Sequence, residues 1–136
     1  MPKFIDANIF IYYIYNSKDE QKLFKRSGEI IDNIIQNNEQ CATSTFVISQ
    51  VCAFLKNRKP SLIELFFKLI EDAKLEVVET DWSLFIEVWL IIKSNPQEAK
   101  RWDDWLIAEQ MKRKGIYEIY SFDTDFDVIP GVKRIH

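Results

Sequence analysis

Short apolar runs alternate along the chain with longer stretches in which apolar residues recur every three or four positions. The short runs predict strands, at residues 3–5, 40–44, 75–79, 117–122 and 132–135, and the first of them is expected to be buried. The longer stretches predict helices, at about residues 9–15, 19–36, 46–56, 61–73, 82–92 and 99–114. Because strands that alternate with helices are joined by crossover connections, we expect an α/β fold. It would be a three-layer α/β/α sandwich around a mostly parallel central sheet of four or five strands.

Signals at helix ends support three of these boundaries. Ser61 is expected to cap the helix at 61–73, with Glu64 as its capping partner three residues further on. Asp81 is expected to cap the helix at 82–92. Gly115 is expected to adopt the left-handed conformation that ends the helix at 99–114.

The length and composition are those of one globular domain. The chain has 136 residues, of which 47% are apolar and 29% charged, and no linker or repeat divides it, so a single domain is expected over residues 1–136. Asp6 and Asn8 interrupt the apolar start of the chain, which therefore predicts a strand and a helix and not a signal peptide. No apolar run is long enough to cross a membrane, and we expect a cytoplasmic protein.

Carboxylates are the only plentiful metal ligands in the sequence. Cys41 and Cys52 do not form a CxxC pair and His136 is the single histidine, so the spacing of a zinc site is absent and both cysteines are expected to be buried thiols. Sites built from oxygen atoms favour hard cations such as Mg²⁺, Mn²⁺ or Ca²⁺. The net charge of −3 argues against a protein that coats nucleic acid by charge alone, but it does not exclude an enzyme that acts on nucleic acid with bound metal.

Three aspartates that are far apart in the sequence are predicted to meet at one edge of the sheet. Asp6 directly follows the first strand, and Asp123 directly follows the fourth. Asp104, with Asp103 beside it, opens the helix that leads into the fourth strand, and such a crossover helix begins at the carboxyl edge of the sheet. Ligands of open parallel sheets bind at this edge. The sequence therefore predicts one pocket that contains Asp6, Asp104 and Asp123.

Each of these acids also has a structural explanation. An Asp at a helix start, such as Asp103 or Asp104, often caps free N–H groups, and Asp125 and Asp127 lie in a predicted turn, where Asp forms local hydrogen bonds. Asp6 is different, because it has apolar residues on both sides and a buried carboxylate must be paired or bound to metal. Crowded carboxylates raise one another's pKa values unless a cation neutralises them. We therefore expect Mg²⁺ or Mn²⁺ at this edge, which suits the hydrolysis of phosphodiesters.

Four segments of the chain, in this order, resemble the sequence blocks of PIN domains. They are FIDANIFIYYI at residues 4–14, TSTFVISQVCAFL at 43–55, RWDDWLIAEQMKRKG at 101–115 and YSFDTDFDVIPGVKRI at 120–135. Many small members of this family are VapC-type toxins of toxin–antitoxin pairs: Mg²⁺- or Mn²⁺-dependent endoribonucleases, often homodimeric and blocked by an antitoxin. The resemblance therefore implies an RNA substrate, a divalent metal cofactor, a homodimer and an antitoxin protein as a partner.

The resemblance also implies roles for individual residues. Asp6, Asp104 and Asp123 would be the catalytic and metal-binding acids, with Asn8 as a partner of Asp6 and Ser121 at a position where Thr or Ser is usual. Other residues could support the site, namely Gln50, Asp103, Asp125 and Asp127. Arg101 lies one helical turn from the predicted metal site and is a candidate for holding a phosphate.

Gln50 departs from the family pattern. The second block normally carries a glutamate on the helix after the second strand, and Gln50 is the matching residue. An amide oxygen can bind a cation but brings no charge, so the site should hold metal more weakly. This departure keeps a second hypothesis open, in which the chain is a weak or inactive PIN-like module that binds RNA or a protein partner.

A phosphoacceptor receiver domain is a third alternative, because it too is a small parallel α/β fold with clustered aspartates. That fold requires an acidic pair after the first strand and an Asp after the third. Here the first strand is followed by Asp6 alone, and the third by Glu79, Thr80 and Asp81, so the receiver domain ranks below the other two hypotheses.

Overall fold

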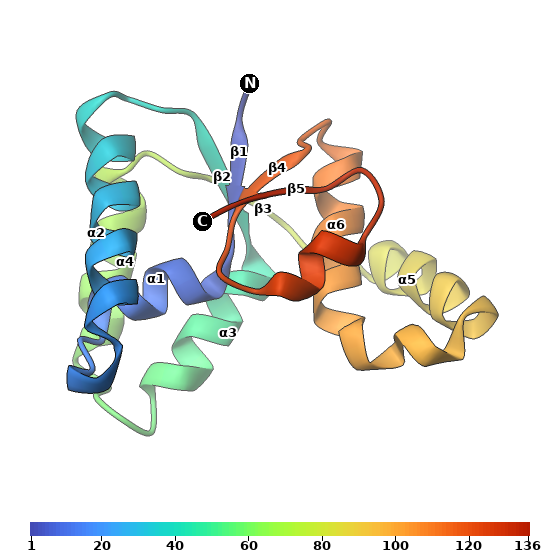
Figure 1. The fold of residues 1–136 in the computed structure, drawn as a ribbon, viewed down its shortest axis with the longest axis horizontal. Helices are drawn as coiled ribbons and strands as arrows, with labels where there is room; N and C mark the ends of the chain where they lie inside the picture. Colours follow the sequence, from blue (N-terminus) through green and yellow to red (C-terminus); the bar gives the residue numbers. More distant parts are fainter.

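The computed structural model describes residues 1–136 as five strands, six α-helices and three short 3₁₀-helices (Figure 1). The strands are β1 Lys3–Ile5, β2 Cys41–Ser44, β3 Glu76–Val78, β4 Glu118–Tyr120 and β5 Lys133–Ile135. The α-helices are α1 Ala7–Ile14, α2 Gln21–Gln36, α3 Thr45–Leu55, α4 Leu62–Asp72, α5 Trp82–Ser94 and α6 Trp102–Arg113. The 3₁₀-helices are η1 Lys18–Glu20, η2 Pro96–Arg101 and η3 Thr124–Val128.

The five strands form one parallel sheet in the order β3-β2-β1-β4-β5. From β1 the chain builds outward to β2 and β3 on one side, and it then returns to add β4 and β5 on the other. The strand order therefore reverses between β1 and β4, which pair directly, with Ile5 opposite Tyr120. Ligands of doubly wound sheets bind outside the carboxyl ends of the strands at such a switch point.

Helices cover both faces of the sheet, which gives the three expected layers (Figure 1). α1 packs against α2, α3 and α4 on one face, while α5 and α6 pack together on the other. The main hydrophobic core has 25 buried residues and includes the central strand residues Phe4, Ile5 and Ile119. A smaller cluster joins Leu84, Val88 and Ile92 of α5 to Leu106 of α6. The predicted α/β class and the parallel sheet are confirmed.

Two of the three predicted helix ends have the expected geometry. The Asp81 carboxylate accepts a hydrogen bond from the Leu84 N–H at 3.0 Å and so caps α5. Gly115, with φ +70°, follows α6 in the left-handed conformation. The predicted Ser61 cap is wrong: Ser61 is itself in a helical conformation and its side chain accepts no capping bond. The chain already turns at Lys59 and Pro60, whose carbonyls accept bonds from the N–H groups of residues 62 and 63.

The helix predicted at residues 99–114 has a different start. Residues 96–101 form the 3₁₀-helix η2, and the α-helix begins only at Trp102. Pro96 occupies the first position of η2, where a backbone N–H would have no partner within the helix, so the missing N–H of proline costs nothing there. None of the helices combines the length and the apolar character that crossing a membrane would require.

Candidate metal centre

The predicted acids come from three elements that end or begin at the switch point. Asp6 follows β1 directly and is the N-cap of α1, and its N–H donates to the Tyr120 carbonyl at 3.1 Å, which extends the pairing of β1 with β4. Asp123 follows β4 by three residues and is the N-cap of η3. Asp103 and Asp104 lie in the first turn of α6. The crossover geometry thus brings residues more than one hundred positions apart to one edge of the sheet.

Three carboxylates form a tight cluster at this edge. Oxygen atoms of Asp104, Asp123 and Asp125 all lie within 4.8 Å of one another. Asp104 is buried, with 8% of its surface exposed, while Asp123 and Asp125 are half-buried. The N–H of Asp125 donates to the Asp123 carboxylate at 2.9 Å, so the tight turn of η3 places both acids beside Asp104. The structure therefore brings together two of the three main predicted acids and one of the supporting acids.

Asp6 lies next to this cluster and is held by several donors. One carboxylate oxygen, Oδ1, accepts from the Ala7 N–H at 2.8 Å, while Oδ2 accepts from Ser121 Oγ at 2.7 Å and from Asn8 Nδ2 at 3.3 Å. The Asn8 carboxamide oxygen in turn accepts from the Phe122 N–H at 3.2 Å. Asn8 and Ser121 therefore join the end of β1 to the end of β4 and fix the orientation of Asp6.

Burial and mutual repulsion raise the pKa values of two of these acids. Burial raises the pKa of Asp6 to about 6, although hydrogen bonds from Ser121 and Ala7 lower it, and the charges of Asp123 and Asp103 raise it further. Burial raises the pKa of Asp104 to about 8, and the charges of Asp123 and Asp6 add to this effect. In both cases the protein makes the ionised carboxylate less favourable than it is in water.

The donor set fits a hard divalent cation. The carboxylate oxygens of Asp104, Asp123 and Asp125 lie close together. Their negative charge is only partly compensated by neighbouring groups, and burial removes part of their contact with water. A cation at this place would favour the ionised forms that burial disfavours. Oxygen ligands without sulfur or imidazole are those that Mg²⁺ and Mn²⁺ prefer.

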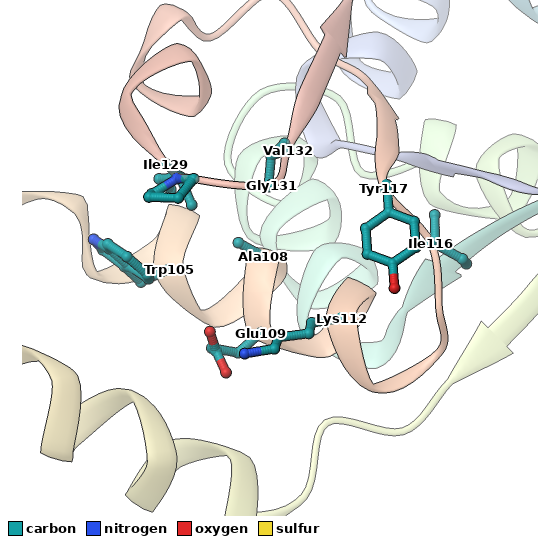
Figure 2. A pocket seen from close by; sticks show the side chains of 10 residues that line it. Trp105, Ala108, Glu109, Lys112, Ile116, Tyr117, Ile129, Gly131 and Val132 are labelled. Atoms are coloured by element: carbon teal, nitrogen blue, oxygen red, sulfur yellow. The ribbon is translucent and has the colours of Figure 1, made fainter.

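A separate apolar pocket lies away from the acids. It has a volume of about 280 Å³ and lies between α6 and the turn that leads into β5. Figure 2 shows Trp105, Ala108 and Tyr117 around it, with Glu109 and Lys112 as its charged residues. None of the predicted site acids lines this pocket, so we place the candidate site at the acidic cluster.

Comparison with known proteins agrees with this arrangement. The family model of the PIN domain matches residues 3–132. The chain belongs to the PIN domain family. No curated protein sequence matches it significantly.

Two solved structures share the fold of this PIN domain. VapC20 of Mycobacterium tuberculosis, a sarcin–ricin loop cleaving toxin, is 17% identical, with 93% of each chain covered and a TM-score of 0.72. VapBC2 from Rickettsia felis, bound to a DNA fragment from their promoter, is 16% identical, with 99% of this chain and 98% of that chain covered and a TM-score of 0.66. At these identities the similarity is one of fold.

Gln50 faces the acids of this PIN domain from α3. Its side-chain nitrogen donates a long hydrogen bond of 3.4 Å to the Asp103 carboxylate. Its side-chain oxygen is buried and has no hydrogen-bond partner. A buried acceptor without a partner is unusual, since it loses its bond to water and gains none in return. An oxygen ligand is therefore available at this position, but without the charge of a glutamate.

Arg101 and Asp127 are both engaged in ion pairs near the site. Arg101 contacts Glu98 at 2.5 Å and Asp125 at 3.3 Å, so it lies beside the cluster but two carboxylates already neutralise it. Asp127 forms a two-pronged ion pair with Arg134, at 2.9 and 3.0 Å, and does not join the cluster. Neither Glu98 nor Arg134 is predicted from the sequence, although two residues three positions apart on one helix, such as Glu98 and Arg101, commonly form an ion pair.

Proposed function

We propose that this PIN domain is a metal-dependent endoribonuclease that hydrolyses RNA phosphodiester bonds, and that it is the toxin of a toxin–antitoxin pair. The observation that carries the proposal is the convergence of Asp104, Asp123 and Asp125 beside Asp6 at the switch point of the sheet. Family membership and the fold shared with two VapC-containing structures support it.

In this proposal the cation, Mg²⁺ or Mn²⁺, supplies charge stabilisation at the phosphate and activation of the attacking water. Asp6, Asp104 and Asp123 bind it. Asn8 and Ser121 hold Asp6 in place through the hydrogen bonds at 3.3 and 2.7 Å. Arg101 would contact the substrate phosphate when it exchanges Asp125 for phosphate oxygens, because a planar guanidinium can bind a phosphate through two parallel hydrogen bonds as it binds a carboxylate.

Cleavage of RNA by the purified chain tests the proposal directly. We expect cleavage in Mg²⁺ or Mn²⁺ and none in EDTA. Asp6→Asn, Asp104→Asn and Asp123→Asn should each lower the rate at least about 100-fold, since each removes the charge of a ligand that holds the cation. Asp72→Asn is the matched control, because Asp72 is exposed at the end of α4. Cleavage that survives EDTA, or that all three variants retain, would refute the proposal.

Gln50 favours one alternative, a catalytically weak or inactive module that binds RNA or a protein partner. The site then lacks the charge needed to hold its cation at physiological Mg²⁺. The alternative predicts that the wild-type chain binds RNA without cutting it and that Gln50→Glu gains cleavage. Vigorous cleavage by the wild type that depends on Asp104 would rule it out.

We also propose two protein partners, an antitoxin and a second copy of the chain. Four large apolar side chains on α5 are exposed, namely Trp82, Ile86, Trp89 and Leu90, and their spacing places them along one side of the helix. A surface of this kind supports burial against a partner. Sedimentation equilibrium of the chain alone tests the homodimer, and a monomeric mass at micromolar concentration would refute it.

A further inference from the structure

A basic pocket of about 580 Å³ lies between the first half of α2 and the ends of β4 and β5. Four of its charged residues come from α2, namely Lys22, Lys25, Arg26 and Glu29. Positions 22, 25, 26 and 29 share one face of a helix. Phe122 and His136 line the pocket from the strand ends.

This pocket is at the same edge of the sheet as the acids. The end of α2 leads into the start of β2, which lies at the amino edge of the sheet. The first half of α2 therefore lies at the carboxyl edge, where the acids are. Phe122 immediately precedes Asp123, and its ring packs edge-on against Tyr12 of α1, with the ring centres 5.8 Å apart. In Figure 1, α2 and α6 lie on opposite sides of the sheet. Phe122 lines the pocket beside Asp123, while Arg101, at the start of α6, pairs with Asp125, so the pocket and Arg101 approach the acids from different elements.

The positive charge of the pocket is only partly neutralised. Arg26 pairs with Glu29 at 3.2 Å, but no carboxylate lies within 4.0 Å of the amino groups of Lys22 and Lys25. The chain as a whole carries a net charge of −3, so a phosphate-rich ligand needs a local region of positive charge to approach the acids. Two free lysines provide phosphate contacts, and a half-buried phenylalanine ring provides apolar surface for a base.

From this arrangement we infer that the pocket formed by Lys22, Lys25, Arg26 and Phe122 binds the single-stranded RNA that flanks the scissile phosphate. Lys22 and Lys25 contact backbone phosphates, and Phe122 contacts a base next to the cleavage site. The inference rests on the proposed ribonuclease function and adds to it the path of the substrate.

Charge reversal on the α2 face tests the inference. Lys22→Glu/Lys25→Glu is compared with Lys68→Glu/Lys93→Glu, which changes the net charge equally on the exposed surfaces of α4 and α5. Both are made in an Asp123→Asn background, so that RNA is bound but not cut. Fluorescence anisotropy measures the affinity for a labelled single-stranded RNA of mixed sequence. Repeating the titration at several salt concentrations gives the salt dependence.

We expect the α2 variant to bind at least about tenfold more weakly than the control variant. The slope of log K against log salt should fall by about 1.4, because each phosphate contact to a single strand contributes about 0.7. In the cleavage assay without Asp123→Asn, the same lysine changes should raise KM by a similar factor and leave kcat within about twofold, since they act on flanking phosphates and not on the reacting one.

The possible outcomes separate the inference from the proposed function. If the α2 and control variants bind RNA equally, the inference is overturned, while cleavage by the wild type still supports the ribonuclease. If the α2 variant loses binding but the wild type cleaves nothing, the pocket stands and the ribonuclease fails. If the Asp123→Asn parent binds no RNA at all, the inference is overturned, and cleavage by the wild type alone decides the ribonuclease.

Discussion

Ser121 is the residue at which the two strand ends of the site meet. Its hydroxyl donates to the Asp6 carboxylate at 2.7 Å and accepts from the Asp123 N–H at 3.0 Å and from Asn8 at 3.3 Å. A hydroxyl can donate one bond and accept two, so Ser121 makes every bond available to it. It is also fully buried, so no water replaces a bond that is lost.

Ser121→Ala should therefore lower the free energy of unfolding by about 1–3 kcal/mol, because it leaves buried partners without a bond. Ser49→Ala is the control, since Ser49 is exposed on α3. Urea denaturation in EDTA measures both variants. If Ser121→Ala unfolds at the same urea concentration as Ser49→Ala, the bonds of Ser121 do not stabilise the site.

Gln50→Glu should strengthen metal binding by about tenfold, because a carboxylate adds charge where the amide oxygen has no partner and affinity follows ligand charge. Calorimetric titration with Mn²⁺ measures the change. Gln36→Glu, at the exposed end of α2, adds the same charge far from the site and should leave the affinity unchanged. Equal affinities for Gln50→Glu and the wild type would show that residue 50 does not contact the cation.

At the scale of elements, Glu39 connects two strands of the sheet to α2 through hydrogen bonds. Its carboxylate accepts from Lys3 of β1 at 2.9 Å, from the Tyr120 hydroxyl of β4 at 2.7 Å and from Asn33 of α2 at 3.2 Å. Burial raises the pKa of Glu39, but hydrogen bonds from Lys3 and Tyr120 outweigh it and hold the pKa below its ordinary value. A depressed carboxyl pKa stabilises the fold above the pKa of the unfolded chain, and this stabilisation is lost as the pH falls through the folded value.

Glu39→Gln should lower the free energy of unfolding by about 1–2 kcal/mol at pH 7, since it removes a bond to a charged group. The difference from the wild type should shrink as the pH falls below about 4.3, the ordinary pKa of Glu. Urea denaturation at several pH values measures it, with Glu71→Gln, exposed on α4, as the control. A difference that does not depend on pH would contradict the assigned role of the Glu39 charge.

Two glycines should respond to alanine in opposite directions. Gly28 lies inside α2 and an added Cβ meets nothing within 4 Å, so Gly28→Ala should stabilise the protein by about 0.5–1 kcal/mol. Gly115 has equal space but a φ of +70°, so Gly115→Ala should destabilise it by about 1 kcal/mol through backbone strain. Thermal unfolding of the two variants measures both signs, and a gain for Gly115→Ala would show that α6 does not need this conformation.

The sequence was sufficient for the order of the elements but not for some of their ends. Strand-like and helix-like patterns located all five strands and six α-helices. The central strands β1, β2 and β4 are largely buried, whereas the edge strands β3 and β5 are half-buried or exposed. The predicted Ser61 cap is wrong because the backbone conformation of Ser61 is set by the turn at Pro60 and not by its residue type. Residues 96–101 were read partly as the helix of α6, because 3₁₀ and α periodicity are hard to distinguish over six residues.

The placement of Asp6, Asp104 and Asp123 at one edge of the sheet was predictable from the sequence, because two strand ends and a helix start locate them along the chain. Their contacts were not predictable. In the sequence, Asp125 and Asp127 are equivalent residues of a predicted turn. Only the fold shows that Asp127 forms an ion pair with Arg134 of β5 while Asp125 joins the cluster. The same holds for Gln50, whose unpartnered oxygen depends on how α3 packs beside α6. Side-chain partners from distant elements are set by tertiary packing, which no local pattern records.

At the scale of the whole molecule, the fold concentrates negative charge at one edge of its sheet. Burial and repulsion raise the pKa of Asp104 to about 8, so the cluster opposes folding when its acids are ionised. A ligand that binds only the folded state stabilises it, by about 2.7 kcal/mol at a concentration one hundred times its Kd. Under the proposed function, part of the stability would therefore depend on the cation.

Asp104→Asn separates these two effects. In EDTA the variant should melt a few degrees higher than the wild type. With a pKa of about 8, the buried Asp104 carboxyl must stay mostly protonated at a pH well above its ordinary pKa, and the amide of the variant avoids this cost of about 1 kcal/mol or more. In saturating Mg²⁺ or Mn²⁺ the order should reverse, since the wild type gains stability from the cation and the variant has lost a ligand. Differential scanning calorimetry at pH 7.5 measures all four states, and Asp72→Asn, exposed on α4, should melt like the wild type under both conditions. Two results together would contradict this role: a wild-type melting temperature that Mg²⁺ and Mn²⁺ leave unchanged, and an Asp104→Asn variant that melts lower than the wild type in EDTA. Asp104 would then be a structural residue of α6 and not a metal ligand.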